Sequence, residues 1–172
     1  MTEPAQPWHV PVRLEDISET GLHLDLVADA RARAGLAALA GVRDMPRLEV
    51  AVDLVRHGGG LRVTGRVSAT VGQTCVVTLE PMENQVDESI DVIFAPSSAG
   101  DFADQNAACD ADEPPEVLSD GTADLGAIAA EFLLLGIDPY PRKPGAEFAP
   151  PAQEGAATTP FAALAKLKDA KN

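Results

Sequence analysis

Aromatic residues, cysteines and long apolar runs are all scarce in this sequence, and each shortage narrows the class of protein. Only 4% of the 172 residues are aromatic, so the core must be built mainly from valine, leucine, isoleucine and alanine. No run approaches the roughly 18 apolar residues that a membrane-spanning helix needs. The first eight residues have no basic start and no apolar stretch, so no signal peptide is predicted there. These features predict a cytoplasmic protein without a membrane partner.

The two cysteines, Cys75 and Cys109, are too few to indicate a disulfide framework. Cys75 is followed by two valines and has no base beside it in the sequence. A reactive cysteine needs an adjacent base or an electropositive setting. We therefore favour a buried structural thiol at Cys75 over a nucleophile.

No catalytic or metal-binding pattern is visible. His9, His23 and His57 lie on separate segments without CxxC or HxxxH spacing, so a surface or packing role is favoured for each. The Gly58-Gly59-Gly60 run precedes a strand pattern, whereas a phosphate-binding loop precedes a helix. We expect no enzymatic activity, metal, cofactor or small-molecule substrate. Only a deep pocket with acids converging on His23 or His57 would change this expectation.

What the sequence has in excess is negative charge, and that charge is unevenly placed. The net charge is −14, yet residues 1–66 hold eight bases and nine acids. Residues 67–141 hold fifteen acids and no lysine or arginine, and residues 142–172 hold five bases and three acids. A nucleic acid could approach only the first or last of these segments without strong repulsion. The acidic middle suits a basic partner or solvent.

Alternating apolar residues predict a sheet that is largely antiparallel. The clearest signal is a hairpin, in which two alternating runs, 48–54 and 61–71, flank the triple glycine. Gly65 lies on the apolar face of the second run and predicts a bend or bulge. Further strands are predicted at 8–14, 22–26, 75–79, 86–94 and 116–119. Glu88 interrupts one apolar row, so the start of that strand is expected at a sheet edge.

Two amphipathic helices are predicted. Asp29 can cap a helix that runs through Ala40 and ends at Gly41. A second helix begins near Asp124, and Gly136 can end it. The apolar side of the first is formed by Ala32, Leu36, Leu39 and Ala40, and that of the second by Leu125, Ile128, Ala129, Phe132 and Leu133.

Together these segments predict an α+β domain over residues 1–141. Its sheet has about six strands, could curl towards a barrel, and is covered by one or two helices. The composition of residues 96–115 predicts an acidic loop. Residues 142–158 are predicted to form a linker rich in proline, alanine and glycine, and residues 159–172 a short C-terminal helix.

Two sets of residues are candidates for contact with a partner. The first is Arg31, Arg33, Arg43 and Arg47, which surround the first predicted helix and could contact RNA phosphates. Ordinary surface charge is the slightly favoured alternative, because no aromatic residues are interleaved to stack bases. The second is Phe161, Leu164 and Leu167, which form one side of the C-terminal helix and could bind a partner protein. The alternative is that this helix packs on its own domain.

Three stretches carry a family resemblance. The segment VGQTCVVTLEP, Val71–Pro81, resembles the strand and turn of the YceD family, the large ribosomal RNA subunit accumulation proteins. Residues 124–135, DLGAIAAEFLLL, resemble its second characteristic segment, and PFAAL at 160–164 resembles its C-terminal ending. The resemblance spans roughly residues 8–170 and rests on the combination of these motifs.

The resemblance implies a non-catalytic factor that supports the synthesis, processing or accumulation of large-subunit ribosomal RNA. Its partner would be the RNA precursor or a basic ribosomal or assembly protein. The alternative hypothesis is a protein-binding adaptor, unrelated to RNA, that acts through the acidic loop or the C-terminal helix. Many relatives have a second cysteine where this chain has Thr78, and some have later cysteines where it has Asp138-Pro139-Tyr140. The resemblance therefore carries no thiol pair or zinc site over to this chain.

Overall fold

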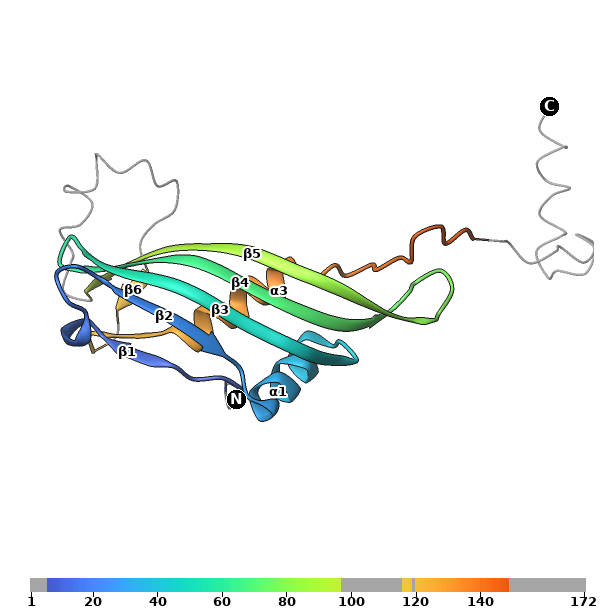
Figure 1. Cartoon of the computed structure of the whole chain (residues 1–172), viewed down its shortest axis with the longest axis horizontal. Helices are drawn as coiled ribbons and strands as arrows, with labels where there is room; N and C mark the ends of the chain where they lie inside the picture. Colours follow the sequence, from blue (N-terminus) through green and yellow to red (C-terminus); the bar gives the residue numbers. More distant parts are fainter. Residues whose placement is uncertain (1–5, 97–115, 119, 149–172) are drawn as a thin grey trace, which may run out of the picture.

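A computed structural model describes residues 6–96, 116–118 and 120–148 and shows an α+β fold (Figure 1). The main sheet has five strands in the order β2-β3-β4-β5-β6, and β1 and β7 form a separate two-stranded ribbon. The elements are β1 (Pro11–Arg13), the 3-10 helix η1 (Leu14–Asp16), β2 (Leu22–Val27), α1 (Ala30–Ala40), β3 (Asp44–His57), β4 (Gly60–Thr74), β5 (Pro81–Pro96), β6 (Glu116–Leu118), β7 (Thr122–Asp124) and α3 (Leu125–Gly136).

The predicted hairpin is confirmed and forms the centre of the sheet. Strands β3 and β4 pair antiparallel from His57 and Gly60 at the turn to Asp44 and Gly72 at the far end. Strand β5 pairs antiparallel with β4 along almost its whole length, whereas β6 pairs parallel with only the last three residues of β5. The sheet is therefore largely antiparallel, as predicted, and most of β5 has a neighbour on one side only among the described strands.

The sheet does not close into a barrel, so that part of the prediction is wrong. Its outer strands β2 and β6 do not pair with each other, and the β1–β7 ribbon is hydrogen-bonded to neither. Strand β6 has three residues and β2 has six, compared with 14 to 16 in the three central strands. Such short outer strands leave the long curved sheet open, with two elongated margins (Figure 1).

Two of the predicted strands are also corrected. Cys75–Leu79 is not a strand but part of the connection between β4 and β5, because the N–H of Leu79 turns back to the carbonyl of Cys75 at 2.9 Å. In the segment 8–14 only Pro11–Arg13 pairs, with β7. Trp8 instead packs into the core, and its carbonyl lies so close to Gly126 that a Cβ there would be 2.4 Å from the oxygen.

Gly65 permits a close approach between neighbouring strands. It pairs in register with Val52, and the register shift in the hairpin lies instead between Asp44 and Arg47. A Cβ at residue 65 would lie 2.2 Å from the carbonyl oxygen of Ala51. The glycine thus marks tight backbone packing in the curved sheet, and the predicted bulge lies elsewhere.

Both helices begin at an aspartate cap, and the cap at Asp29 and the start near Asp124 were predicted. The Asp29 carboxylate accepts a hydrogen bond from the N–H of Ala32 at 2.7 Å, and Gly41 ends α1 with φ 66°. Asp124 caps α3, which continues through Gly136. One predicted core residue is wrong: Leu39 is 46% exposed, and the core positions of α1 are Ala32, Leu36 and Ala37. The apolar stripe of α3 is buried except for the half-buried Phe132.

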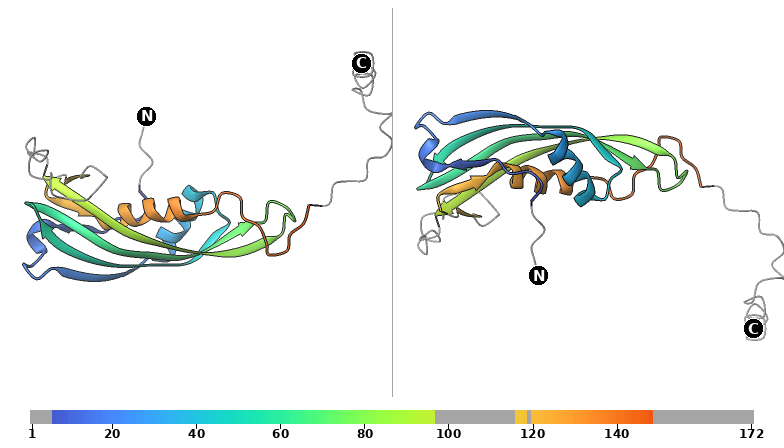
Figure 2. Two further views of the ribbon diagram at one scale, coloured as in Figure 1. Left: turned by 90° about the horizontal axis from the view of Figure 1, so that it is seen from above. Right: turned by 90° about the horizontal axis from the view of Figure 1, so that it is seen from below.

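The two helices cover the same face of the sheet (Figure 2). Helix α1 packs against β3, and α3 packs against β5, β4 and β1. The inward-facing side chains of the hairpin are almost completely buried between these layers, including Leu48, Leu54, Leu61, Val63 and Val67. Neither described helix has the length and hydropathy required to cross a membrane.

Candidate functional site

The four candidate arginines do not form a single cluster. Arg33 and Arg43 line one open groove, Arg31 is exposed elsewhere on α1, and Arg47 lies on β3. Arg47 is paired with Glu49 through two hydrogen bonds of 2.8 and 2.5 Å. The nearby Glu49 carboxylate raises the pKa of Arg47 further above its ordinary value. Part of the charge predicted for RNA contact is therefore already neutralised within the protein.

The groove beside α1 has a volume of about 500 Å³ and a mainly apolar lining. Four alanines of α1 form one wall, and residues 42–46 form the other. The Arg33 guanidinium donates a hydrogen bond of 2.6 Å to the carbonyl of Ala28, so it is held near the start of the helix. The backbone N–H of Arg43 is bonded to the Gly72 carbonyl at 2.8 Å. Hydrogen bonds to the backbone therefore hold both residues in place beside the groove.

The second candidate set, Phe161, Leu164 and Leu167, lies outside the residues that the structure describes, as does Cys109. The same holds for the predicted C-terminal helix and for the acidic loop between β5 and β6. The C-terminal helix and its alternatives therefore stay predictions.

The connection between β4 and β5 has a geometry that sequence reasoning did not anticipate. The Cys75 N–H donates to the carbonyl of Glu80 at 2.9 Å, which closes a short loop. The Val76 N–H donates at 2.9 Å to Pro141, a residue of the segment that follows α3. Two further contacts tie that segment down: Gln73 Nε2 to the Asp138 carbonyl at 2.8 Å, and Lys143 Nζ to Glu80 Oε2 at 2.8 Å.

The Cys75 sulfur lies at the centre of this connection and is fully buried. The backbone N–H groups of Thr78 and Lys143 each donate to Sγ at 3.4 Å. The Thr78 hydroxyl, together with these two N–H groups, lowers the pKa of the Cys75 thiol to about 6, against the opposing effect of burial. Hydrogen bonds to an ionised group stabilise it, and here they outweigh the loss of solvent.

The burial predicted for Cys75 is confirmed, but its thiolate character was missed. The missing signal is non-local, because Lys143 is 68 residues away in the chain. A fully buried sulfur that accepts two backbone hydrogen bonds is suited to holding the connection together. Among the described residues, no group of three or more histidine, cysteine, aspartate or glutamate side chains is arranged to hold a metal ion.

His9 and His23 are exposed and each pairs with a carboxylate, whereas His57 is half-buried at the end of β3. His9 Nδ1 is 2.6 Å from Asp124 Oδ2, beside the cap of α3. His23 Nδ1 is 2.7 Å from Asp53 Oδ1, and this hydrogen bond raises the pKa of His23. These pairs lie outside the groove beside α1.

The fold places this chain in the class of small α+β proteins with an open, largely antiparallel sheet, and in this chain the segment after α3 closes the β4–β5 connection. Within that class the chain belongs to the YceD family: the family model described as "Large ribosomal RNA subunit accumulation protein YceD" matches residues 63–168, more than half of the chain. No curated protein and no solved structure matches the chain.

The matched span includes some of the candidate features and excludes others. It covers most of β4, the Cys75 connection, β5 and α3. It does not include α1, the groove or any of the four arginines. The family match therefore concerns the part of the molecule that contains β4, β5 and α3.

Proposed function

We propose that this chain is a non-catalytic factor that supports the accumulation of large-subunit ribosomal RNA in the cytoplasm. The observation that carries the proposal is the family match over residues 63–168, whose description names that role. A binding function is consistent with the exposed pairing of His9 with Asp124 and of His23 with Asp53, and with the full burial of Cys75.

The surface beside α1 is the most favourable place for RNA contact. Residues 1–66 hold eight of the thirteen bases, whereas β5, β6 and α3 have none. Arg31 and Arg43 are exposed and, unlike Arg47, are not paired with an acid among the residues that the structure describes. Phosphate contacts need such cations, because they release counterions from the RNA backbone. In this proposal Arg31 and Arg43 contribute most, Arg33 supports the groove, and Arg47 contributes least.

The proposal is tested by following the tagged full-length chain on a density gradient of cell extract. We expect it to sediment with precursors of the large subunit and not with those of the small subunit. The double variant Arg31→Gln/Arg43→Gln should weaken that association, with a shallower dependence on salt because two phosphate contacts are lost.

A matched control separates this effect from a change in net charge. The double variant Arg62→Gln/Arg66→Gln removes the same charge from the outer face of the sheet, where these residues pair with Asp91 and Asp87. We expect that variant to keep its association. Equal loss in both variants would refute a specific role for the surface beside α1, and sedimentation of the wild type apart from large-subunit precursors would refute the proposed function.

A further inference from the structure

Among the described residues, most of the long margin of the sheet formed by β5 has no strand beside it. Residues 81–94 of β5 pair with β4 on one side, and β6 covers only residues 94–96 on the other. Figure 1 shows β5 as the upper margin of the sheet, with α3 behind it. In an antiparallel edge strand, alternate N–H and C=O groups point away from the single neighbour. From Pro81 to Ile93 these groups form a template on which another extended segment can pair.

Helix α3 contributes to the same side of the molecule. A Cβ at Gly136 would lie 2.5 Å from the Glu88 side chain, so the end of α3 packs beneath β5. Burial raises the pKa of the Glu116 carboxyl on β6, and the negative charge of the nearby Glu131 raises it further. Glu131 thus lies on an exposed face of α3 near Glu116. Leu135 lies one turn later on that face and is 77% exposed.

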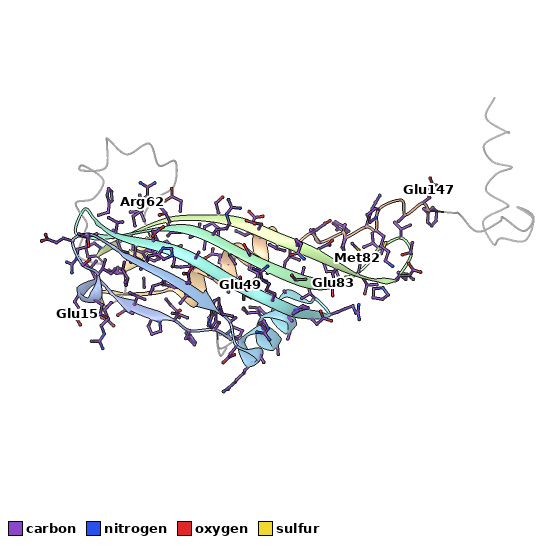
Figure 3. All side chains as sticks on the ribbon, in the orientation of Figure 1. Glu15, Glu49, Arg62, Met82, Glu83 and Glu147 are labelled. Atoms are coloured by element: carbon purple, nitrogen blue, oxygen red, sulfur yellow. The ribbon has the colours of Figure 1, made fainter. Side chains whose placement is uncertain are left out.

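The carboxylates on this side of the molecule differ from those on the outer face of the sheet. On the outer face, Asp87 and Asp91 are held by Arg66 and Arg62. On the side of α3, β5 carries Glu88, and beside it lie Glu116 and Glu131, whereas Glu83, labelled in Figure 3, shares the outer face of β5 with Asp87. No lysine or arginine occurs anywhere in β5, β6 or α3. Glu88, Glu116 and Glu131 and the open edge, together with Leu135, are called here the β5 margin.

The negative charge of the β5 margin determines which kind of partner can bind there. A second copy of the chain paired through β5 would bring glutamates against glutamates, which opposes self-association. An RNA strand would be repelled for the same reason. A basic extended peptide segment matches the surface in two ways, because its backbone can complete the sheet while its cations pair with the glutamates.

We propose that the β5 margin binds an extended, lysine- or arginine-rich segment of a partner protein, which adds a strand to the sheet beside β5. Main-chain hydrogen bonds provide the binding, the glutamates select a basic sequence, and Leu135 contacts an apolar residue of the segment. The surface is distinct from the groove beside α1, so one chain presents a basic site and an acidic site on different elements.

The test uses the isotope-labelled full-length chain and a synthetic peptide of alternating lysine and valine. About ten residues suit the length of the open edge. We expect amide shifts along β5 and slower hydrogen exchange at those β5 amides that point away from β4. The control peptide has the same sequence with alternate backbone nitrogens methylated, which retains the charge and abolishes strand pairing. It should bind far more weakly.

Paired variants of the protein test the role of charge. Glu88→Gln/Glu131→Gln should weaken peptide binding by about three- to tenfold, the range expected for two exposed ion pairs. Asp87→Asn/Asp91→Asn removes the same net charge from the outer face and should have a clearly smaller effect. Because both pairs of changes are isosteric and exposed or half-buried, we expect the variants to stay folded, which the amide spectrum verifies.

Three results would overturn the proposal. Equal binding of the methylated peptide would show charge attraction without strand addition. Shifts confined to other elements, or no binding, would mean that the glutamates only keep the edge from aggregating. Displacement of the peptide from β5 by an RNA oligonucleotide would assign the margin to nucleic acid. The test requires no ribosomal material, so its failure would leave the proposed function standing.

Discussion

The two ends of β4 reverse the chain in different ways. At one end, Gly58 and Gly59 take positive φ values of 53° and 81°, and β3 passes into β4 through a tight turn. At the other end, residues 75–80 connect β4 to β5, and this connection is held by Pro141 and Lys143 from the far side of α3. The first turn depends on local chemistry and the second on contacts formed only when the whole domain has folded.

The difference also concerns the family. The match begins at residue 63, so it includes the Cys75 connection and excludes the glycine turn. A tight glycine turn serves any hairpin, because glycine accepts positive φ at little cost. The Cys75 connection instead links the sheet to the segment after α3. We infer that the connection is a defining structural feature of this half of the molecule.

The largest effect is expected at the glycine turn. Gly60 is buried, and a Cβ there would lie 1.9 Å from the carbonyl oxygen of Phe94 on β5. Gly60→Ala should therefore lower the free energy of unfolding by about 3 kcal/mol, at the upper end for a forced backbone shift. Gly59→Ala is the control: no atom lies within 4 Å, and only the positive φ costs about 1 kcal/mol. Urea unfolding of both variants measures this, and equal losses would contradict the close approach.

A smaller loss is expected at the other end of β4. Cys75→Ala removes a buried sulfur that accepts hydrogen bonds from Thr78 and Lys143. The unpaired N–H groups should cost about 2 kcal/mol in unfolding free energy. Val76→Ala, which changes a partly exposed neighbour, should cost well under half of that. If Cys75→Ala were as mild as Val76→Ala, the sulfur would not be holding the connection.

The Cys75 connection should also make the free energy of unfolding depend on pH, which the glycine turn cannot do because its glycines have no titrating group. The thiol has a pKa of about 6 in the folded protein, below the roughly 8.5 of an unfolded chain. Folding therefore favours the thiolate, and this contribution is fully present above the unfolded pKa. It declines as pH falls from about 8.5 towards 6.

The measurement compares the unfolding free energy of Cys109→Ser with that of Cys75→Ala/Cys109→Ser across this pH range. Their difference should shrink as the pH falls. Other titrating groups, including His23, are common to both proteins and cancel in the difference. A difference that is constant with pH would show that Cys75 does not ionise in the folded state.

The smallest effect is expected for Lys143→Gln. Lys143 Nζ pairs with Glu80 Oε2 at 2.8 Å, and both side chains are partly or largely exposed. This lysine lowers the pKa of Glu80. The variant should let that pKa return towards its ordinary value, as seen by carboxyl NMR titration, with little change in stability. A loss of stability as large as that of Cys75→Ala would mean that the side chain, rather than the backbone N–H, holds the segment.

Sequence reasoning succeeded where the cause of the structure is local. The hairpin follows from alternation around three glycines, and the cap at Asp29 and the start of α3 near Asp124 follow from residue type and position. It failed at Cys75–Leu79, where apolar residues imitate a strand although Leu79 takes φ 59°. Nothing in that stretch indicates its partner segment beyond residue 136.

The candidate site was less predictable than the fold for the same reason. Proximity in sequence grouped four arginines, but only the folded chain shows that Arg47 pairs with Glu49 and that Arg33 and Arg43 share a groove. Similarly, the long stretch without bases was visible in the sequence, whereas the pairing of Asp87 and Asp91 with arginines of β4 depends on register. The number of charges in a segment can be read from the sequence, whereas their pairing with opposite charges depends on the folded structure.

The central claim is that the chain supports the accumulation of large-subunit ribosomal RNA. The most direct test is to delete its gene in the native host and to measure the ratio of large- to small-subunit ribosomal RNA. We predict a selective fall in the large-subunit species, which expression of the wild-type chain restores. An unchanged ratio, in a host without a second member of the family, would contradict the claim.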